Sequence, residues 1–143
     1  MFVKPIGQAG VFALRPIPLF LERVSAGFPS PAQDFIEKAL DLNELCIQHP
    51  AATFFDRVSG DSMTGAGIFP GDILVVDRSL TARHGDIIIA IIDGEFTVKE
   101  LALKPRPKLI ARNPAYLSID IADDGSLETF GVVTRSIRDF RAR

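Results

Sequence analysis

The chain has 143 residues, enough for one ordinary domain with its own hydrophobic core. Its 47% hydrophobic and 24% charged residues are typical of a globular protein and exclude a disordered or collagen-like chain. A formal net charge of −2 does not favour nucleic acid as the default partner, and the longest apolar run, Ile87–Ile92, is far too short to span a membrane.

The cysteine and histidine content limits the chemistry further. Cys46 is the single cysteine, and His49 and His84 are the two histidines, so we expect no disulfide within the chain and no structural zinc site. The sequence carries no phosphate-binding glycine loop, no dinucleotide fingerprint and no HExxH motif. We therefore expect no metal and no cofactor, and the lack of a disulfide framework favours the cytoplasm.

The first part of the chain, residues 1–32, holds five of the ten prolines. Proline removes a backbone donor and fixes φ, so we predict an extended arm, and its many large apolar side chains predict that it docks on a surface. Val24–Ala26 has the small residues of a signal peptidase site. Arg15, Pro16 and Glu22 interrupt the apolar stretch that a secretion signal would need before it, so we do not expect secretion.

A single short helix is expected next, over roughly residues 31–40. Ser30 is a suitable N-cap, Pro31 suits the first helical position, and apolar residues follow at helical spacing. The stretch Asp41–Ile47 is ambiguous between helix and loop, and His49-Pro50 ends it because a residue before proline avoids the helical region.

From residue 52 onward the sequence predicts strands separated by turns. Asp93-Gly94 is a strong hairpin signal between two of these strands. Turns every eight to fifteen residues, with no long helix between them, favour a compact antiparallel β-barrel or sandwich. The expected strands are Thr53–Val58, Ile73–Val76, Ile87–Ile92, Phe96–Leu103, Leu109–Ala111 and Leu127–Ile137.

Ser62 is the first candidate for catalysis. It lies in the segment Ser59–Met63, where Gly60 permits an unusual backbone conformation and a tight turn. Such a turn can present a serine hydroxyl together with the backbone N–H groups that an oxyanion hole needs. The alternative from the residues alone is a polar turn in which Asp61 caps a helix.

Lys99 is the second candidate. Alternation along its strand places it on one face with Thr97, Leu101 and Leu103. If that face is buried, desolvation lowers the pKa of the lysine and makes its amine a competent general base for a serine. The alternative is an edge-strand lysine that extends to solvent. A Ser-His-Asp triad that uses His84 is not excluded by spacing.

Several blocks of sequence together resemble the UmuD/MucA family of proteins. They occur in the family's order and at its distances between about Pro29 and Val133, and the arginine-rich C-terminal end matches less closely. The blocks are Asp41–Leu45, Gln48–Pro50, Ser59–Met63, Gly71–Asp77, His84–Ile87 and Asp93–Lys99.

The resemblance implies a LexA-like, mostly β peptidase fold with an N-terminal arm. It implies a serine-type autopeptidase in which Ser62 is the nucleophile and Lys99 the general base, with the scissile bond between Ala26 and Gly27. Residues 1–26 would be the cleavable arm, and 27–143 the peptidase and dimerisation domain.

The resemblance also implies the partners. The family's proteins are homodimers that cleave themselves when a RecA filament on single-stranded DNA promotes the reaction. The shortened form joins a UmuC-like error-prone DNA polymerase in translesion synthesis, within the SOS response to DNA damage. Neither a membrane nor sequence-specific DNA is expected as a partner.

Three other functions share some of these sequence features. A LexA-type repressor would need a DNA-binding domain that 26 proline-rich residues do not supply. A type I signal peptidase shares the Ser62-Met63 pair but would need a membrane anchor. A non-catalytic polymerase-binding module with a relic dyad stays open, as does a role in DNA or polymerase contact for the arginine-rich end, Arg135–Arg143.

Overall fold

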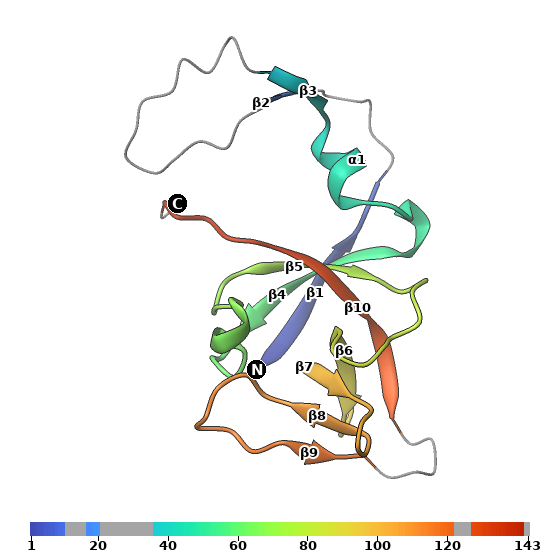
Figure 1. Ribbon diagram of the computed structural model, residues 1–143, viewed down its shortest axis with the longest axis vertical. Coiled ribbons are helices and arrows are strands. Elements are labelled where there is room, and N and C mark those ends of the chain that lie inside the picture. The colour runs from blue at the N-terminus through green and yellow to red at the C-terminus, as the bar shows by residue number, and fades with distance from the viewer. Residues whose placement is uncertain (11–16, 21–35, 122–126, 142–143) are drawn as a thin grey trace. The chain divides into compact units, whose positions relative to one another are not determined.

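The computed structural model describes residues 1–10, 17–20, 36–121 and 127–141 (Figure 1). These residues belong to two compact units. One unit consists of Met1–Gly10 with His49–Arg143, and the other of Val11–Gln48. The larger unit contains the strands expected after residue 52, and it also contains the first ten residues of the arm.

The larger unit is an antiparallel β-structure. Its sheet has the strand order β1-β4-β5-β10-β6-β7-β8-β9, and a further pairing of β1 with β7 closes the first six strands into a barrel. The strands are β1 (Phe2–Gln8), β4 (Thr53–Ser59), β5 (Ile73–Asp77), β6 (Ile87–Ile92), β7 (Glu95–Ala102), β8 (Lys108–Ile110), β9 (Ile119–Asp120) and β10 (Glu128–Ile137). The prediction of a mostly β, antiparallel fold is confirmed.

Two apolar clusters form the core of this unit. The sheet continues beyond the barrel, so strand residues are buried on both faces. In β6, the consecutive residues Ile88, Ile89 and Ala90 are all buried. At Gly131 of β10, a Cβ atom would lie 2.7 Å from Cγ1 of Val76, so the close crossing of β10 and β5 requires glycine. The clusters are Met1, Val3, Val58, Met63, Ile68, Leu74, Val76, Ile89 and Val98, and separately Ile88, Ala90, Leu101, Leu109 and Val132.

The hairpin between β6 and β7 forms where the sequence predicts it. Asp93 and Gly94 both have positive φ, at 50° and 78°, which is the requirement of a two-residue type I′ turn. Since the hairpin sets the register of Ile88 opposite Lys99, it also fixes which β7 residues face inward.

One carboxylic acid is buried among the apolar side chains of the larger unit. Asp56 of β4 is 0% exposed, and neither carboxyl oxygen has a hydrogen-bond partner among the described residues. Desolvation raises the pKa of this carboxyl from 3.8 to about 6. The charged form of Asp56 therefore opposes folding above that pH.

The smaller unit corrects the helix expected over residues 31–40. Ile36–Leu40 is a strand, β3, which pairs with β2 (Ile17–Phe20), while residues 31–35 lie outside the described part of the chain. The short helix is α1, Leu42–Cys46, in the stretch that the sequence left ambiguous. Asp41 is its N-cap, since its side chain accepts from the backbone N–H of Glu44.

No helix among the described residues has the length and apolar character needed to cross a membrane.

Candidate active site

The turn after β4 holds Ser62. Gly60 has φ of +83° and turns the chain at the end of the strand. Met63 is fully buried in the core. The backbone on both sides of Ser62 is therefore held in place. Ser62 itself is 0% exposed. The backbone N–H of Ser62 donates to no other described residue, so it remains available to a carbonyl oxygen of a substrate.

Lys99 reaches Ser62 from strand β7, which is separated from β4 by β1. Its Nζ donates to Oγ of Ser62 at 3.0 Å, and also contacts Oγ1 of Thr97 at 3.4 Å and the carbonyl of Val98 at 3.2 Å. Lys99 is 6% exposed, and desolvation lowers the pKa of its amine, an effect that the hydrogen bond to the N-terminal amine partly opposes.

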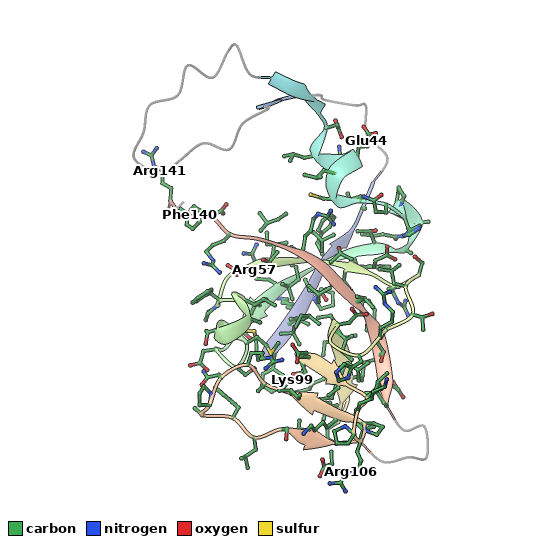
Figure 2. The ribbon with its side chains drawn as sticks, in the orientation of Figure 1. Glu44, Arg57, Lys99, Arg106, Phe140 and Arg141 are labelled. Atoms are coloured by element: carbon green, nitrogen blue, oxygen red, sulfur yellow. The ribbon has the colours of Figure 1, made fainter. Side chains whose placement is uncertain are left out.

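The environment of Lys99 matches the sequence expectation with one correction. Thr97 and Leu101 are buried beside it as alternation predicts. Leu103 is not, because β7 ends at Ala102 and Leu103 is 41% exposed. Figure 2 shows the contrast with Arg106, which lies at the outer edge of the unit, whereas Lys99 lies within it.

A second amine also contacts the serine. The N-terminal amine of Met1 donates to Oγ of Ser62 at 2.7 Å, because β1 starts beside the turn that carries this residue. Desolvation, with the nearby charge of Lys99 as a smaller cause, lowers the pKa of this amine from 8.0 to about 6. The proline-rich composition predicts an extended arm over residues 1–26, but no sequence signal predicts that its first residue contacts Ser62.

A loop after β8 holds the Ser62 turn in place, and no sequence motif predicts this role. Asn113 donates from its side chain to the carbonyl of Asp61 at 2.9 Å, and the hydroxyl of Tyr116 donates to the Asp61 carboxylate. The backbone N–H of Gly65 donates to the carbonyl of Arg112 at 2.7 Å. Since the polar residues of this loop carry no motif, their role is visible only in three dimensions.

The histidines take part in other interactions. Nδ1 of His49 lies 2.6 Å from the Asp77 carboxylate, and Nδ1 of His84 accepts from the backbone N–H of Leu103 at 2.9 Å. Burial would raise the pKa of Asp77, but hydrogen bonds from Ser79 and His49 outweigh it and lower that pKa. Ser62 thus contacts Lys99 rather than His84, and the triad alternative loses its geometric basis.

Ala26 and Gly27, the expected scissile pair, lie outside the described residues. Their part in the site stays a prediction from the resemblance.

Comparison with known proteins identifies the family of this chain. The model of the family described as Peptidase S24-like matches residues 18–134. The chain belongs to this family. Within it, the chain is 53% identical over 140 residues to the protein MucA of Salmonella typhimurium, covering 96% of this chain and 94% of MucA. It is also 54% identical to the protein SamA of the same species, over 87% of each chain.

A repressor is a more distant relative of this chain. LexA repressor 1 of Xanthomonas campestris is 39% identical over 138 residues, which cover 95% of this chain but 67% of the repressor. The near full-length matches are to MucA, SamA and ImpA, so the chain is a member of the UmuD/MucA family, and the expected LexA-like peptidase fold is confirmed.

Proposed function

We propose that this chain is a self-cleaving serine peptidase that uses Ser62 as nucleophile and Lys99 as general base, and that it acts in SOS mutagenesis. The observation that carries the proposal is the 3.0 Å contact between Nζ of Lys99 and Oγ of Ser62 in a buried site. A buried amine with a lowered pKa next to a serine hydroxyl is the arrangement that activates a serine without histidine.

The proposed reaction hydrolyses the bond between Ala26 and Gly27. Neutral Lys99 takes the hydroxyl proton while Oγ of Ser62 forms a bond to the carbonyl carbon of Ala26. The bond to the nitrogen of Gly27 then breaks, and Lys99 returns the proton to that leaving amine. Water, deprotonated by the same lysine, hydrolyses the acyl-enzyme and frees Ser62.

The partners follow from membership of the UmuD/MucA family. A RecA filament on single-stranded DNA stimulates the cleavage of a homodimer in the cytoplasm, and the product Gly27–Arg143 joins a UmuC-like polymerase in translesion synthesis. The lowered pKa of Lys99 supports a partner that supplies no catalytic group, because the base is already present in the chain. The role of the partner is then to favour the conformation in which the bond reaches Ser62.

The test is cleavage of the purified chain, with and without RecA, single-stranded DNA and a nucleoside triphosphate. The masses of the products identify the bond that is cut. We expect the cut after Ala26, faster with the filament, and none in a Ser62→Ala chain. A chain that stays intact under every condition would contradict the peptidase proposal and favour a polymerase-binding module with a relic dyad.

A further inference from the structure

Strand β1 lies in the site as a bound peptide would. The carbonyl of Met1 accepts from the backbone N–H of Val98 at 3.1 Å and from the hydroxyl of Thr97 at 2.8 Å. Ser59 donates from its side chain to the carbonyl of Phe2 at 3.2 Å. The strand therefore bridges β4 and β7 at the point where both reach Ser62.

Main-chain pairing holds most of this strand. The register of β1 on β4 runs from Phe2 opposite Ser59 to Gln8 opposite Phe54, with an irregularity between Pro5 and Gly7. Strand addition of this kind depends on backbone hydrogen bonds, which every extended peptide segment offers. The groove that holds β1 therefore suits a second extended segment of the chain as well.

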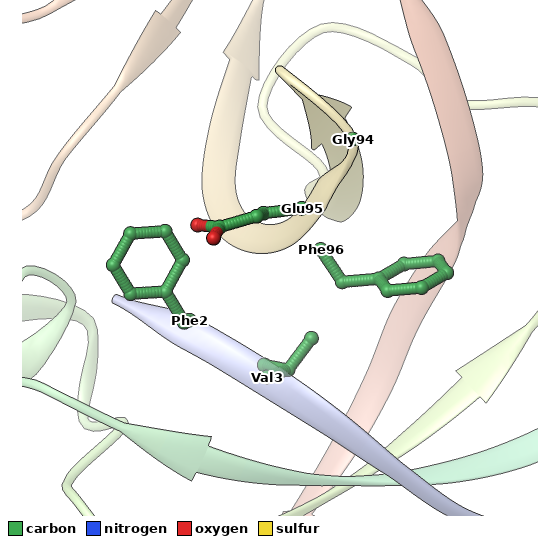
Figure 3. A pocket seen from close by; sticks show the side chains of 5 residues that line it. All are labelled: Phe2, Val3, Gly94, Glu95 and Phe96. Atoms are coloured by element: carbon green, nitrogen blue, oxygen red, sulfur yellow. The ribbon is translucent and has the colours of Figure 1, made fainter.

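The side chains at the start of β1 differ in how firmly they are held. Met1 and Val3 are 6% and 8% exposed, whereas Phe2 is 54% exposed and borders an open hollow of about 420 Å³. Figure 3 shows the Glu95 side chain extending toward the ring of Phe2 across this hollow.

The position of the Met1 amine indicates which half of a substrate this groove holds. When a peptide bond is cut, the carbonyl carbon joins the serine oxygen and the leaving amine takes a proton from the base. That amine must therefore lie close to both Oγ of Ser62 and Nζ of Lys99. The Met1 amine lies 2.7 Å from Oγ of Ser62, which also accepts from Lys99, so β1 occupies the leaving-amine side.

The groove leaves little room beside the first residue. A Cβ atom on Gly60 would lie 3.3 Å from Cα of Met1, which is tighter than ordinary van der Waals contact. The sequence after the expected scissile bond is also similar to that of β1: Gly27–Pro31 and Met1–Pro5 both have Phe second and Pro fifth.

We infer that the groove between β4 and β7 binds the segment on the leaving-amine side of the scissile bond, and that strand β1 of the uncleaved chain competes for this groove and inhibits cleavage. The inference rests on the proposed self-cleavage. Its consequence is that β1 must leave the groove before Ser62 can attack, so the observed rate is lowered in proportion to the small fraction of chains in which the groove is free of β1.

A reversible lock on β1 tests the competition. Lys4 and Arg57 are exposed register partners on β1 and β4, at a separation that a disulfide spans. The test chain carries Lys4→Cys and Arg57→Cys in a Cys46→Ser background. The control chain carries Ile73→Cys and Ile137→Cys, which joins β5 to β10 and leaves β1 free.

Cleavage of each chain is followed at alkaline pH, oxidised and reduced. We expect oxidation to slow the Lys4/Arg57 chain at least about tenfold and reduction to restore its rate, with no such effect in the control. An oxidised Lys4/Arg57 chain that is cut as fast as its reduced form overturns the inference. A wild-type chain that is never cut refutes the proposed function instead, and the measurement below then tests separately whether β1 occupies the groove.

The second measurement does not depend on cleavage. The full-length Ser62→Ala chain is treated at neutral pH with an amine-acylating reagent, and the label on Met1 is quantified by mass spectrometry. We expect acylation of Met1 at least about tenfold slower in the folded chain than in urea, because β1 buries the amine. Equal rates would show that β1 does not occupy the groove.

Discussion

Nζ of Lys99 lies 3.0 Å from Oγ of Ser62, although the two residues are 37 positions apart in the sequence. The turn after β4 and the middle of β7 supply the two groups, and strand β1, paired with both, starts beside them. The proposed catalytic pair thus lies where the pairing of β1 with β7 closes the barrel.

Replacement of Ser62 by alanine is expected to abolish cleavage and leave the fold intact. The hydroxyl accepts hydrogen bonds from two amines, and its loss changes the free energy of unfolding by about 1 kcal/mol. Product masses and a thermal unfolding curve check both parts. If the Ser62→Ala chain is still cut after Ala26 in a mixture free of other peptidases, the nucleophile is another group.

Bulky residues at the expected scissile bond should block processing. We expect Ala26→Phe and Gly27→Lys to stop cleavage, because a shallow site accepts only small side chains next to the bond. The conservative change Ala26→Ser is the control and should be cut at nearly the normal rate. Normal rates for Ala26→Phe or Gly27→Lys would place the cut at another bond.

Cleavage without a partner should accelerate as the pH rises through the pKa of Lys99 and then level off. Desolvation lowers this pKa below its usual 10.5, and only the neutral amine takes the proton from Ser62. Lys99→Arg should be inactive at every pH because a guanidinium does not deprotonate in this range. Lys99→Ala should be slow and lose the rise with pH.

Rate profiles of the three chains between neutral and alkaline pH supply the measurement. A Lys99→Arg chain that is cut with the wild-type profile would remove Lys99 from the mechanism and leave hydroxide or another base in its place.

The loop after β8 should affect rate rather than the pH profile. Asn113→Ala removes the hydrogen bond to the carbonyl of Asp61, so the Ser62 turn is held less precisely and cleavage should slow about tenfold. Leu117→Ala is the control, since Leu117 is 90% exposed. The pH at which the rate reaches half its maximum should not move, because Lys99 keeps its surroundings. A shifted midpoint would mean that Asn113 acts through the base instead.

Asp56→Asn should stabilise the protein at neutral pH. The pKa of this carboxyl is raised to about 6 in the folded state, so the folded chain binds more protons than the unfolded chain between pH 3.8 and about 6. Stability therefore falls as pH rises through this window, and the cost is complete above it, at most ~3 kcal/mol.

Thermal unfolding of the wild type and of Asp56→Asn at pH 4 and pH 7.5 is the measurement. The variant should unfold at a higher temperature than the wild type at pH 7.5, and the advantage should vanish at pH 4. An equal advantage at both values would contradict a cost that arises from the charge of Asp56.

The strands from residue 53 onward could be predicted from the sequence because each follows from local pattern. An apolar run bounded by turn residues marks β6, and Asp93-Gly94 favours a two-residue hairpin turn with positive φ at both positions. The pairing of a serine turn with a lysine on an apolar face followed from side-chain chemistry and from the family resemblance, and the contact of Ser62 with Lys99 agrees with it.

Local pattern was insufficient where strand pairing is decided by a distant segment. Phe2–Gln8 contains a proline and a glycine and lacks alternation, so its strand exists because β4 and β7 offer unpaired backbone groups. Ile36–Leu40 has helical spacing but pairs with β2, and that pairing outweighs its local preference. The tertiary structure alone brought the Met1 amine to Ser62 and the Asn113 side chain to Asp61, since both contacts join segments far apart in the chain.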